Sequence, residues 1–152
     1  MFDSLTLETY GKKRRLTQTP EPGPKIKKTG RFRFVVQEHH ATHLHWDFRL
    51  ELDGVLKSWA VPRGPPEESG LRRLAVEVED HPVDYISFEG TIPQGNYGAG
   101  SVKIWDKGTF RLKIRTDDMY EFWLNGKRLK GKYALVRFKQ KNWLFFKTKT
   151  DE

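Results

Sequence analysis

The sequence predicts a mainly β protein: a small closed or partly closed antiparallel β-barrel with an extended N-terminal arm. Three observations favour this fold. Apolar and polar residues alternate in short runs, turn signals separate the runs, and no stretch shows the apolar period of an amphipathic helix. The length of 152 residues suits one folded unit, and an aromatic content of 13% suits a barrel core. We therefore divide the chain into an arm, residues 1–30, and a single barrel domain, residues 31–152.

The arm has no sustained periodicity, carries a basic run at residues 12–15 and ends in the proline-rich segment 20–24. A basic run of this kind is usually solvated. The whole chain, however, has a net charge of +8, which favours a polyanionic partner, nucleic acid first. The arm is therefore a candidate phosphate-contacting segment.

The composition also excludes several classes of protein. There is no cysteine, which removes disulfides, thiolate metal sites and cysteine nucleophiles together. No apolar run approaches the roughly 18 residues that a membrane helix needs. We expect a soluble, intracellular protein of the cytoplasm with no membrane partner.

Roughly nine short strands account for the barrel. They are expected at residues 31–39, 43–52, 55–61, 74–78, 101–105, 109–115, 119–124, 132–138 and 143–147. The turn signals Asp53-Gly54, Lys107-Gly108 and Asn125-Gly126 separate neighbouring strands. We assign the tryptophans in the later strands (Trp105, Trp123 and Trp143) to packing in preference to base stacking.

Residues 39–49 hold four of the five histidines. From His43 onward polar and apolar residues alternate strictly, so His45, Asp47 and Arg49 lie on one face of a strand. The corner at residues 40–42 makes the preceding strand its neighbour, which brings His39 to the same face. Imidazole and carboxylate donors suit a first-row divalent metal, with coordination positions left open for water and substrate. We predict His39, His45 and Asp47 as metal ligands; the alternative is a solvated sheet face that happens to carry histidines.

Two loops add polar groups. Residues 80–85 form a turn that presents His81 and Tyr85, although a plain turn histidine and a barrel-edge tyrosine are the simpler interpretations. Residues 91–100 form a Gly-rich loop that lacks the lysine and the strand-to-helix setting of a nucleotide-binding P-loop. We interpret it as a shaped turn that helps to form the site.

Many ordered blocks of the chain closely resemble the 3′-phosphoesterase domain of bacterial DNA ligase D and its stand-alone relatives. The blocks are residues 33–39, 43–51, 57–62, 73–75, 79–82, 84–85, 88–90, 92–93, 97–100 and 131–136. The resemblance implies a compact β-barrel hydrolase that depends on manganese and heals 3′ ends of DNA or RNA in strand-break repair. Such an enzyme removes a terminal ribonucleoside to leave a 3′-phosphate, then removes the phosphate. Its partners would be 3′ ends carrying a ribonucleotide or a phosphate, and separate ligase and polymerase chains.

The resemblance also implies roles for individual residues. The family's metal ligands match His39, His45 and Asp47, and its phosphate-contacting catalytic residues match Arg49, His81 and Tyr85. Supporting polar groups match Gln37, Arg63, Arg73 and Glu79, and arm contacts match Arg14 and Glu21. The arm departs from the family pattern at Arg15, where relatives commonly have Asp, and this change bears on the balance between the diesterase and monoesterase activities.

We expect water to attack the phosphate directly, because no cysteine is present and no serine lies in an evident triad. Two other functions remain open. His45, Asp47 and His81 also fit the two-histidine, one-carboxylate set of iron oxygenases, and the basic barrel fits a non-catalytic nucleic-acid-binding protein. A complete ligase is excluded, because Glu51 stands where the adenylated lysine of Lys-x-Asp-Gly is required.

Overall fold

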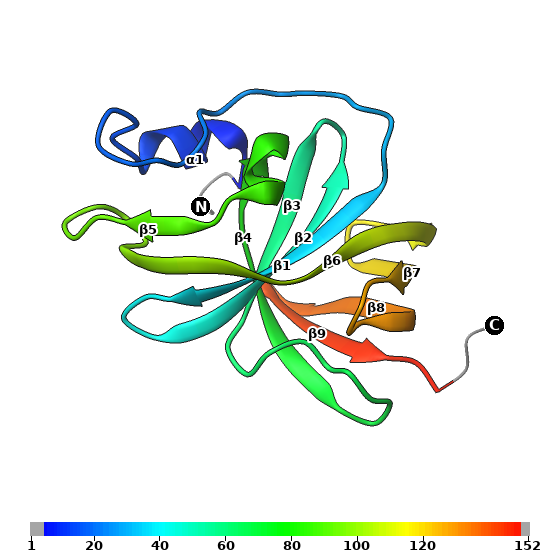
Figure 1. Ribbon diagram of the computed structural model, residues 1–152. Coiled ribbons are helices and arrows are strands. Elements are labelled where there is room, and N and C mark those ends of the chain that lie inside the picture. The colour runs from blue at the N-terminus through cyan, green and yellow to red at the C-terminus, as the bar shows by residue number, and fades with distance from the viewer. Residues whose placement is uncertain (1–4, 150–152) are drawn as a thin grey trace.

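This computed structural model describes residues 5–149, which contain nine strands, one α-helix and one 3-10 helix (Figure 1). In chain order they are α1 (Leu7–Lys12), β1 (Arg33–His40), β2 (Leu44–Leu52), β3 (Val55–Val61), β4 (Arg72–Pro82), the 3-10 helix η1 (Val83–Ser87), β5 (Gly90–Ile92), β6 (Gly100–Arg115), β7 (Met119–Asn125), β8 (Lys130–Lys139) and β9 (Asn142–Lys147).

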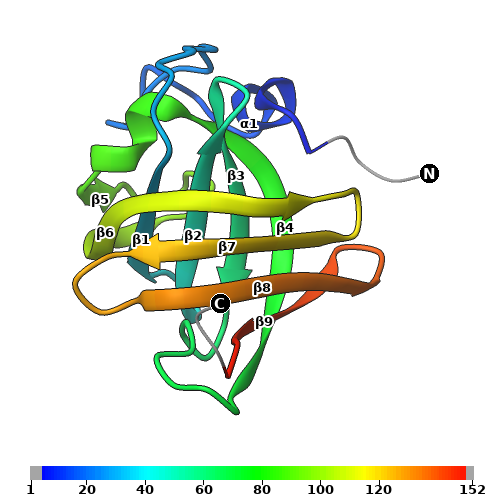
Figure 2. The same cartoon turned by 90° about the vertical axis from the view of Figure 1, so that its right-hand side faces the viewer.

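The sheet closes on itself. Its order is β1-β2-β3-β4-β9-β8-β7-β6-β5, every pair is antiparallel, and β1 also pairs with β6. Eight strands therefore form the barrel, while the short β5 pairs with the first residues of β6. Figure 2 shows β6, β7 and β8 crossing in front of β1 to β4. The expected closed antiparallel barrel is confirmed.

Aromatic side chains fill the barrel. Phe48 is fully buried and stacks on Phe122 with 5.9 Å between ring centroids, and it packs at 4.7 Å on Phe145. Trp143 is only 1% exposed, in agreement with a packing role. The alternation of β2 sends its apolar residues into this core, so its polar residues must point out of the barrel wall.

One expected turn is absent. We predicted a break at Lys107-Gly108, but β6 runs unbroken from Gly100 to Arg115. A Cβ atom at Gly108 would overlap the backbone carbonyl of Asn125, so the glycine is required for the close approach of two strands. The sequence signal was real but its cause was packing rather than a turn.

The arm is partly helical, which its sequence did not predict. Helix α1 has six residues, too few for an apolar period to be recognised. Leu7 and Tyr10 are buried in a second apolar cluster on the outside of the barrel, with Tyr85, Phe88 and other residues. The arm thus covers part of the barrel wall, as Figure 1 shows for α1 beside β4. No helix within residues 5–149 is long and apolar enough to cross a membrane.

Candidate metal centre and active-site pocket

Three donor side chains converge on the outer face of β1 and β2. The strands pair with His39 opposite His45 and with Gln37 opposite Asp47. Asp47 Oδ2 lies 3.6 Å from His39 Nδ1 and 3.3 Å from His45 Nε2. One donor atom from each residue lies within 4.8 Å of the others, so the group can hold a metal ion.

Backbone carbonyls determine which nitrogen of each imidazole is free. His39 Nε2 lies 2.7 Å from the carbonyl oxygen of Gly98, and His45 Nδ1 lies 3.0 Å from that of His43. A carbonyl only accepts, so these nitrogens carry the protons and donate. In the neutral rings, the lone pairs of His39 Nδ1 and His45 Nε2 therefore face the Asp47 carboxylate. Three electron-rich atoms turned toward one another can share a cation, and this donor set fits a first-row divalent metal.

The charge state of Asp47 also suits a ligand. Burial raises the pKa of a carboxyl group, but the positive charge of Arg49 and the two neighbouring imidazoles outweigh burial and hold the pKa of Asp47 well below its usual range. Burial likewise opposes protonation of His45, yet the Asp47 carboxylate raises the pKa of that imidazole. Asp47 is thus an anion at neutral pH.

Arg49 has one guanidinium nitrogen without a hydrogen-bond partner among the described residues. Its Nε donates to Gln37 Oε1 at 2.7 Å, and Gln37 Nε2 donates to the carbonyl oxygens of Tyr85 at 2.8 Å and Phe88 at 3.1 Å. Arg49 Nη2 lies 3.4 Å from Asp47 Oδ2, whereas Nη1 is buried without a hydrogen-bond partner among the described residues. A buried guanidinium N–H left unpaired is costly and is expected to meet an anion.

His81 and Tyr85 lie on the next wall of the pocket. His81 is the next-to-last residue of β4. Its Nδ1 donates to the carbonyl of Glu79 at 2.9 Å, and its ring packs edge-on against Tyr85 at 4.7 Å. Burial and the positive charges of Arg49 and Arg14 hold the pKa of His81 well below its usual value, so the ring is neutral with its lone pair at Nε2. Burial raises the pKa of Tyr85, which keeps its hydroxyl protonated.

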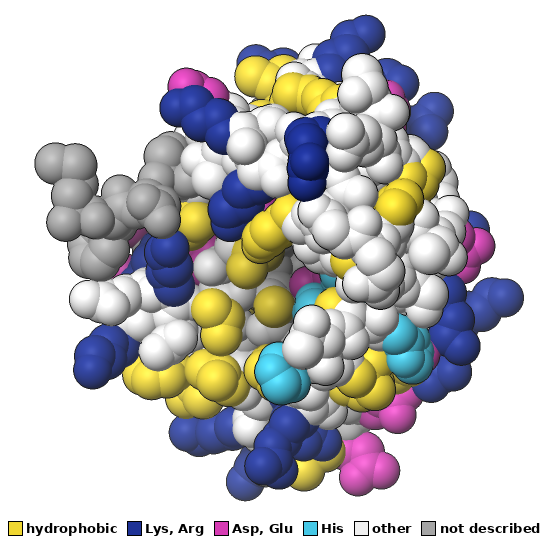
Figure 3. Space-filling model, turned by 90° about the vertical axis from the view of Figure 1, so that its left-hand side faces the viewer, with side chains coloured by type: hydrophobic (Ala, Val, Ile, Leu, Met, Phe, Trp, Pro, Cys, Tyr) yellow, Lys and Arg dark blue, Asp and Glu magenta, His cyan; other side chains and the backbone are white. Residues whose placement is uncertain are grey.

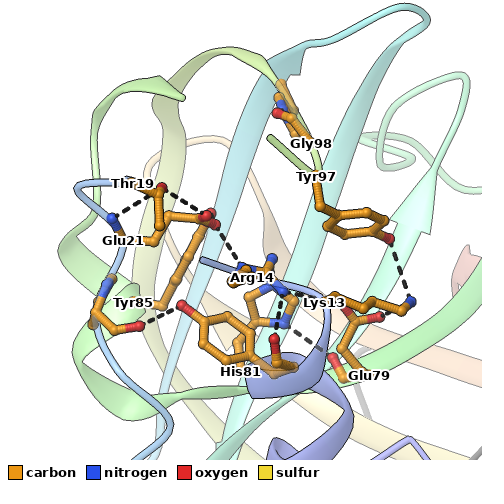
Figure 4. A network of polar contacts seen from close by, with 12 residues as sticks. Lys13, Arg14, Thr19, Glu21, Glu79, His81, Tyr85, Tyr97 and Gly98 are labelled. Atoms are coloured by element: carbon orange, nitrogen blue, oxygen red, sulfur yellow. Dashed lines mark hydrogen bonds and ion pairs between the residues drawn. The ribbon is translucent and has the colours of Figure 1, made fainter. Parts of the chain in front are cut away.

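The arm supplies a polar network above these residues (Figure 4). Glu21 is buried and accepts from Tyr85 Oη at 2.7 Å and from Arg14 Nε at 3.0 Å. Arg14 also reaches Glu79 at 3.4 Å and lies 3.5 Å from His81 Nε2. These contacts join the arm to β4 through Glu79, to which the family resemblance assigns only a supporting role.

The pocket that these groups line has a volume of about 870 Å³. Its other walls are the corner between β1 and β2 and the Gly-rich loop, of which residues 92 and 94–100 line the pocket. Figure 3 looks onto this face of the molecule and shows it hollowed, with histidine side chains at the hollow and Lys and Arg side chains around it. The loop therefore helps to form the site, in agreement with the interpretation from its sequence.

Not every candidate residue reaches the pocket. Arg14, Glu21, His39, His45, Asp47, Arg49, Glu79, His81 and Tyr85 line it. Gln37 lies directly beneath Arg49, whereas Arg63 and Arg73 are not among the lining residues. Tyr97 lines the pocket too, but the sequence marked it only as part of the Gly-rich loop and of the family-like block 97–100, without a role. The iron-oxygenase set is not assembled among the described residues, since the group that can hold a metal contains His39 and not His81.

Residues 37–137 match the family model described as the DNA Ligase D 3′-phosphoesterase domain. A multifunctional non-homologous end joining protein LigD from Pseudomonas aeruginosa is 48% identical over 167 residues, which covers 100% of this chain and 20% of that protein. The LigD protein of Mycolicibacterium smegmatis is 48% identical over 97% of the chain and 21% of its own length. A non-homologous end joining DNA repair protein LigD from Mycobacterium tuberculosis is 46% identical over 96% of the chain and 20% of its own length. The chain thus spans about a fifth of the length of these relatives.

Proposed function

Because the chain belongs to the DNA ligase D 3′-phosphoesterase domain family, we propose that it is a metal-dependent hydrolase of nucleic-acid 3′ ends in strand-break repair. It removes a 3′-terminal ribonucleoside to leave a 3′-phosphate and then removes that phosphate to leave a 3′-hydroxyl. The observation that carries this proposal is the convergence of a His-His-Asp donor set and the unpaired Nη1 of Arg49 in one pocket. Separate ligase and polymerase chains would complete the repair.

His39 Nδ1, His45 Nε2 and an Asp47 carboxylate oxygen would hold the metal ion. We propose Mn²⁺, while the donors also suit other divalent transition metals. A bound ion of this kind polarises a phosphate oxygen and lowers the pKa of water. The carbonyls of Gly98 and His43 keep both imidazoles in the tautomer that can bind it.

Arg49 would bind the phosphate that is to be cleaved. The guanidinium is already oriented by Gln37 at Nε, so Nη1 is the donor that remains for a phosphate oxygen. A donor fixed before the substrate arrives stabilises the charge that develops on the phosphate oxygens without reorganising. Gln37 is then a positioning residue. Arg63 and Arg73 lie outside the pocket lining, and we assign them no contact with the reacting phosphate.

His81 and Tyr85 would handle protons and hydrogen bonds at the phosphate. In its neutral form His81 accepts a proton at Nε2 from the attacking water, and the imidazolium can return it to the leaving oxygen as the P–O bond breaks. Tyr85 keeps its proton and donates a hydrogen bond. Arg14 and Glu21 hold the arm over both residues, so we propose that the arm segment from Arg14 to Glu21 is a working part of the site.

A trimming assay tests the proposal. The protein is stripped of metal and incubated with an end-labelled DNA strand that terminates in one ribonucleotide, with and without added MnCl₂. We expect shortening to a 3′-phosphate and then a 3′-hydroxyl, lost in His45→Ala and His81→Ala. His40→Ala should keep both steps, because His40 borders the pocket but its exposed imidazole pairs with Glu38 and not with Asp47. Binding of the strand without any product, whichever divalent metal is added, would instead support the non-catalytic barrel. A trapped phosphorylated enzyme would contradict direct attack by water.

A further inference from the structure

We propose that Tyr97 binds the base of the 3′-terminal nucleoside by stacking, and so selects for a base-bearing end in the first hydrolytic step. This inference rests on the proposed function and extends it to the part of the substrate that leaves. None of the metal-binding or phosphate-binding roles assigned above involves Tyr97.

The backbone of the Gly-rich loop holds Tyr97 at the pocket. Asn96 N donates to the carbonyl of Pro93 at 3.2 Å and Ala99 N donates to that of Asn96 at 3.1 Å, which makes two consecutive turns. Gly98, the next residue, has a φ of 76° and accepts from His39 Nε2 at 2.7 Å. The loop that carries Tyr97 is thus tied to a metal-ligand candidate, and the ring has a defined position relative to the reacting phosphate.

The ring of Tyr97 is supported on one side and open on the other. Lys13 Nζ lies 4.8 Å and Arg14 Cζ 5.2 Å from the ring centroid, and Lys13 Nζ also reaches the hydroxyl at 3.4 Å. Figure 4 shows both cations below the Tyr97 ring, on the side of the arm. The residue is nevertheless 48% exposed. A large aromatic ring that is held by cations and still exposed at a pocket is suited to bind a flat ligand.

The other walls of the pocket do not suit a base. Apart from Val78, the lining groups on β1, β2 and β4 are charged or imidazole side chains that suit a metal and a phosphate. Tyr85 is only 2% exposed and its ring packs against His81 and Phe88, so its faces are occupied. The two partly buried tryptophans that sequence reasoning considered, Trp105 and Trp123, do not line the pocket. Tyr97 is therefore the aromatic side chain of the lining with an accessible ring.

The chemistry of the substrate then assigns the base to Tyr97. A 3′-terminal nucleoside is linked to the scissile phosphate by its ribose alone, so its base must lie within one sugar of Arg49 and inside the same pocket. Arg14 joins the two ends of this span, since it lies near both the Tyr97 ring and His81 Nε2. Stacking on an aromatic ring accepts any of the four bases, because every base has a π face. We infer an end-trimming step with little preference among bases but a clear requirement for one.

The second hydrolytic step differs in this respect. Once the terminal nucleoside has left, the substrate is a 3′-phosphate with no base beyond it. Tyr97 should then contribute nothing to the removal of the phosphate. The two steps performed by one pocket thereby give an internal control for any variant of Tyr97.

The test compares Tyr97→Ala, Tyr97→Leu and Tyr97→Phe on three labelled strands: one ending in an ordinary ribonucleotide, one ending in an abasic ribose, and one ending in a 3′-phosphate. We expect Tyr97→Ala and Tyr97→Leu to lower kcat/KM for the first strand about 5- to 150-fold, the range that stacking of one base provides. The same variants should leave the other two strands within about 2-fold of the wild type. Tyr97→Phe keeps the ring and loses the hydroxyl contact with Lys13, and it should behave as the wild type on all three.

Three results would overturn the inference. Equal losses on all three strands would mean that Tyr97 only supports the loop and, through Gly98, His39. A loss in Tyr97→Phe as large as in Tyr97→Ala would assign the effect to the hydroxyl group. Unchanged trimming in Tyr97→Ala would remove any role for the ring. A wild-type protein that trims none of the strands would instead overturn the proposed function itself, so the two failures are distinguishable.

Discussion

Replacement of Glu21 by alanine should release the arm from the barrel. The Glu21 side chain has no exposed surface, and its carboxylate accepts from Arg14 Nε at 3.0 Å, from Tyr85 Oη at 2.7 Å and from Thr19 Oγ1 at 2.9 Å. Removing one partner of a buried ion pair costs about 3–5 kcal/mol, because the other charge is left unpaired. Arg14 keeps its contact with Glu79 at 3.4 Å, which places the expected cost at the lower end, about 3 kcal/mol.

The lost free energy is that of arm docking, so it can be measured as a larger population of molecules in which the arm has left the barrel. A cost of about 3 kcal/mol raises the open population roughly 150-fold. The basic run at residues 12–15 supplies trypsin sites inside the docked segment, one of them the buried Arg14. Where opening and closing are fast compared with cleavage, the cleavage rate follows the open population. We therefore expect cleavage of the arm by limiting trypsin to accelerate by about two orders of magnitude, with faster hydrogen exchange over residues 7–22.

Glu8→Gln is the matched control in the same arm. Glu8 pairs with Lys12 at 3.1 Å, but its side chain is 75% exposed. An exposed pair four residues apart on a helix is worth about 0.3–0.5 kcal/mol, so cleavage should change by no more than about 2-fold. If Glu21→Ala and Glu8→Gln gave the same cleavage rate, the buried network would not be what holds the arm, and the argument from burial would be wrong.

Three further variants probe the site and its surroundings. Gln37→Leu leaves Arg49 Nε and two backbone carbonyls unpaired, so it should lower the free energy of unfolding measured in urea by about 2–3 kcal/mol and weaken phosphate binding. Wild-type stability of this variant would contradict the positioning role of Gln37. Burial raises the pKa of Asp80 from 3.8 to about 6 despite the nearby Lys57, so the folded state binds the proton more tightly than the unfolded chain and stability is lost as pH rises from about 4 to 6. Asp80→Asn should therefore stabilise the protein by about 1–2 kcal/mol at pH 8 and by less at pH 5. Destabilisation at pH 8 would mean that the ion pair with Lys57 dominates. Burial lowers the pKa of His81, so on acidification the unfolded chain takes up this proton before the folded protein does. The free energy of unfolding of the wild type should therefore fall by about 1.4 kcal/mol per pH unit below about 6.5, and His81→Gln should lack this contribution when unfolding is measured against pH. Equal slopes in the two proteins would exclude a buried neutral ring.

Strand periodicity is why the donor set could be predicted from sequence. Alternation is a local property, so the sequence alone places His45 and Asp47 on one face, and a short corner makes the strand of His39 their neighbour. The register that sets His39 opposite His45 follows from that corner. Alternation alone suggests an exposed polar face, however, and the structure buries Asp47 and Arg49 to 6% and 3% exposure. The difference is due to the arm and η1, whose docking no local pattern encodes.

Contacts between distant segments account for what could not be predicted. Arg14 and Glu79 lie 65 residues apart in the sequence, and no local pattern around either residue predicts their ion pair. The packing requirement at Gly108 has the same origin, since the strand that it approaches comes later in the chain. The position of the Tyr97 ring could not be predicted for a different reason. A loop has no period, so its sequence shows that a turn exists but not where a side chain points.

Binding of manganese by the chelator-treated protein tests the central claim most directly. Calorimetric titration of MnCl₂ should show one ion per chain, with affinity lowered at least about 100-fold in His45→Ala and Asp47→Asn. His40→Ala should bind as the wild type, because that histidine, although next to His39, turns to Glu38 instead. Wild-type affinity in His45→Ala, or an equal loss in His40→Ala, would show that the donor set on β1 and β2 does not hold the metal, and the proposed chemistry would lose its basis.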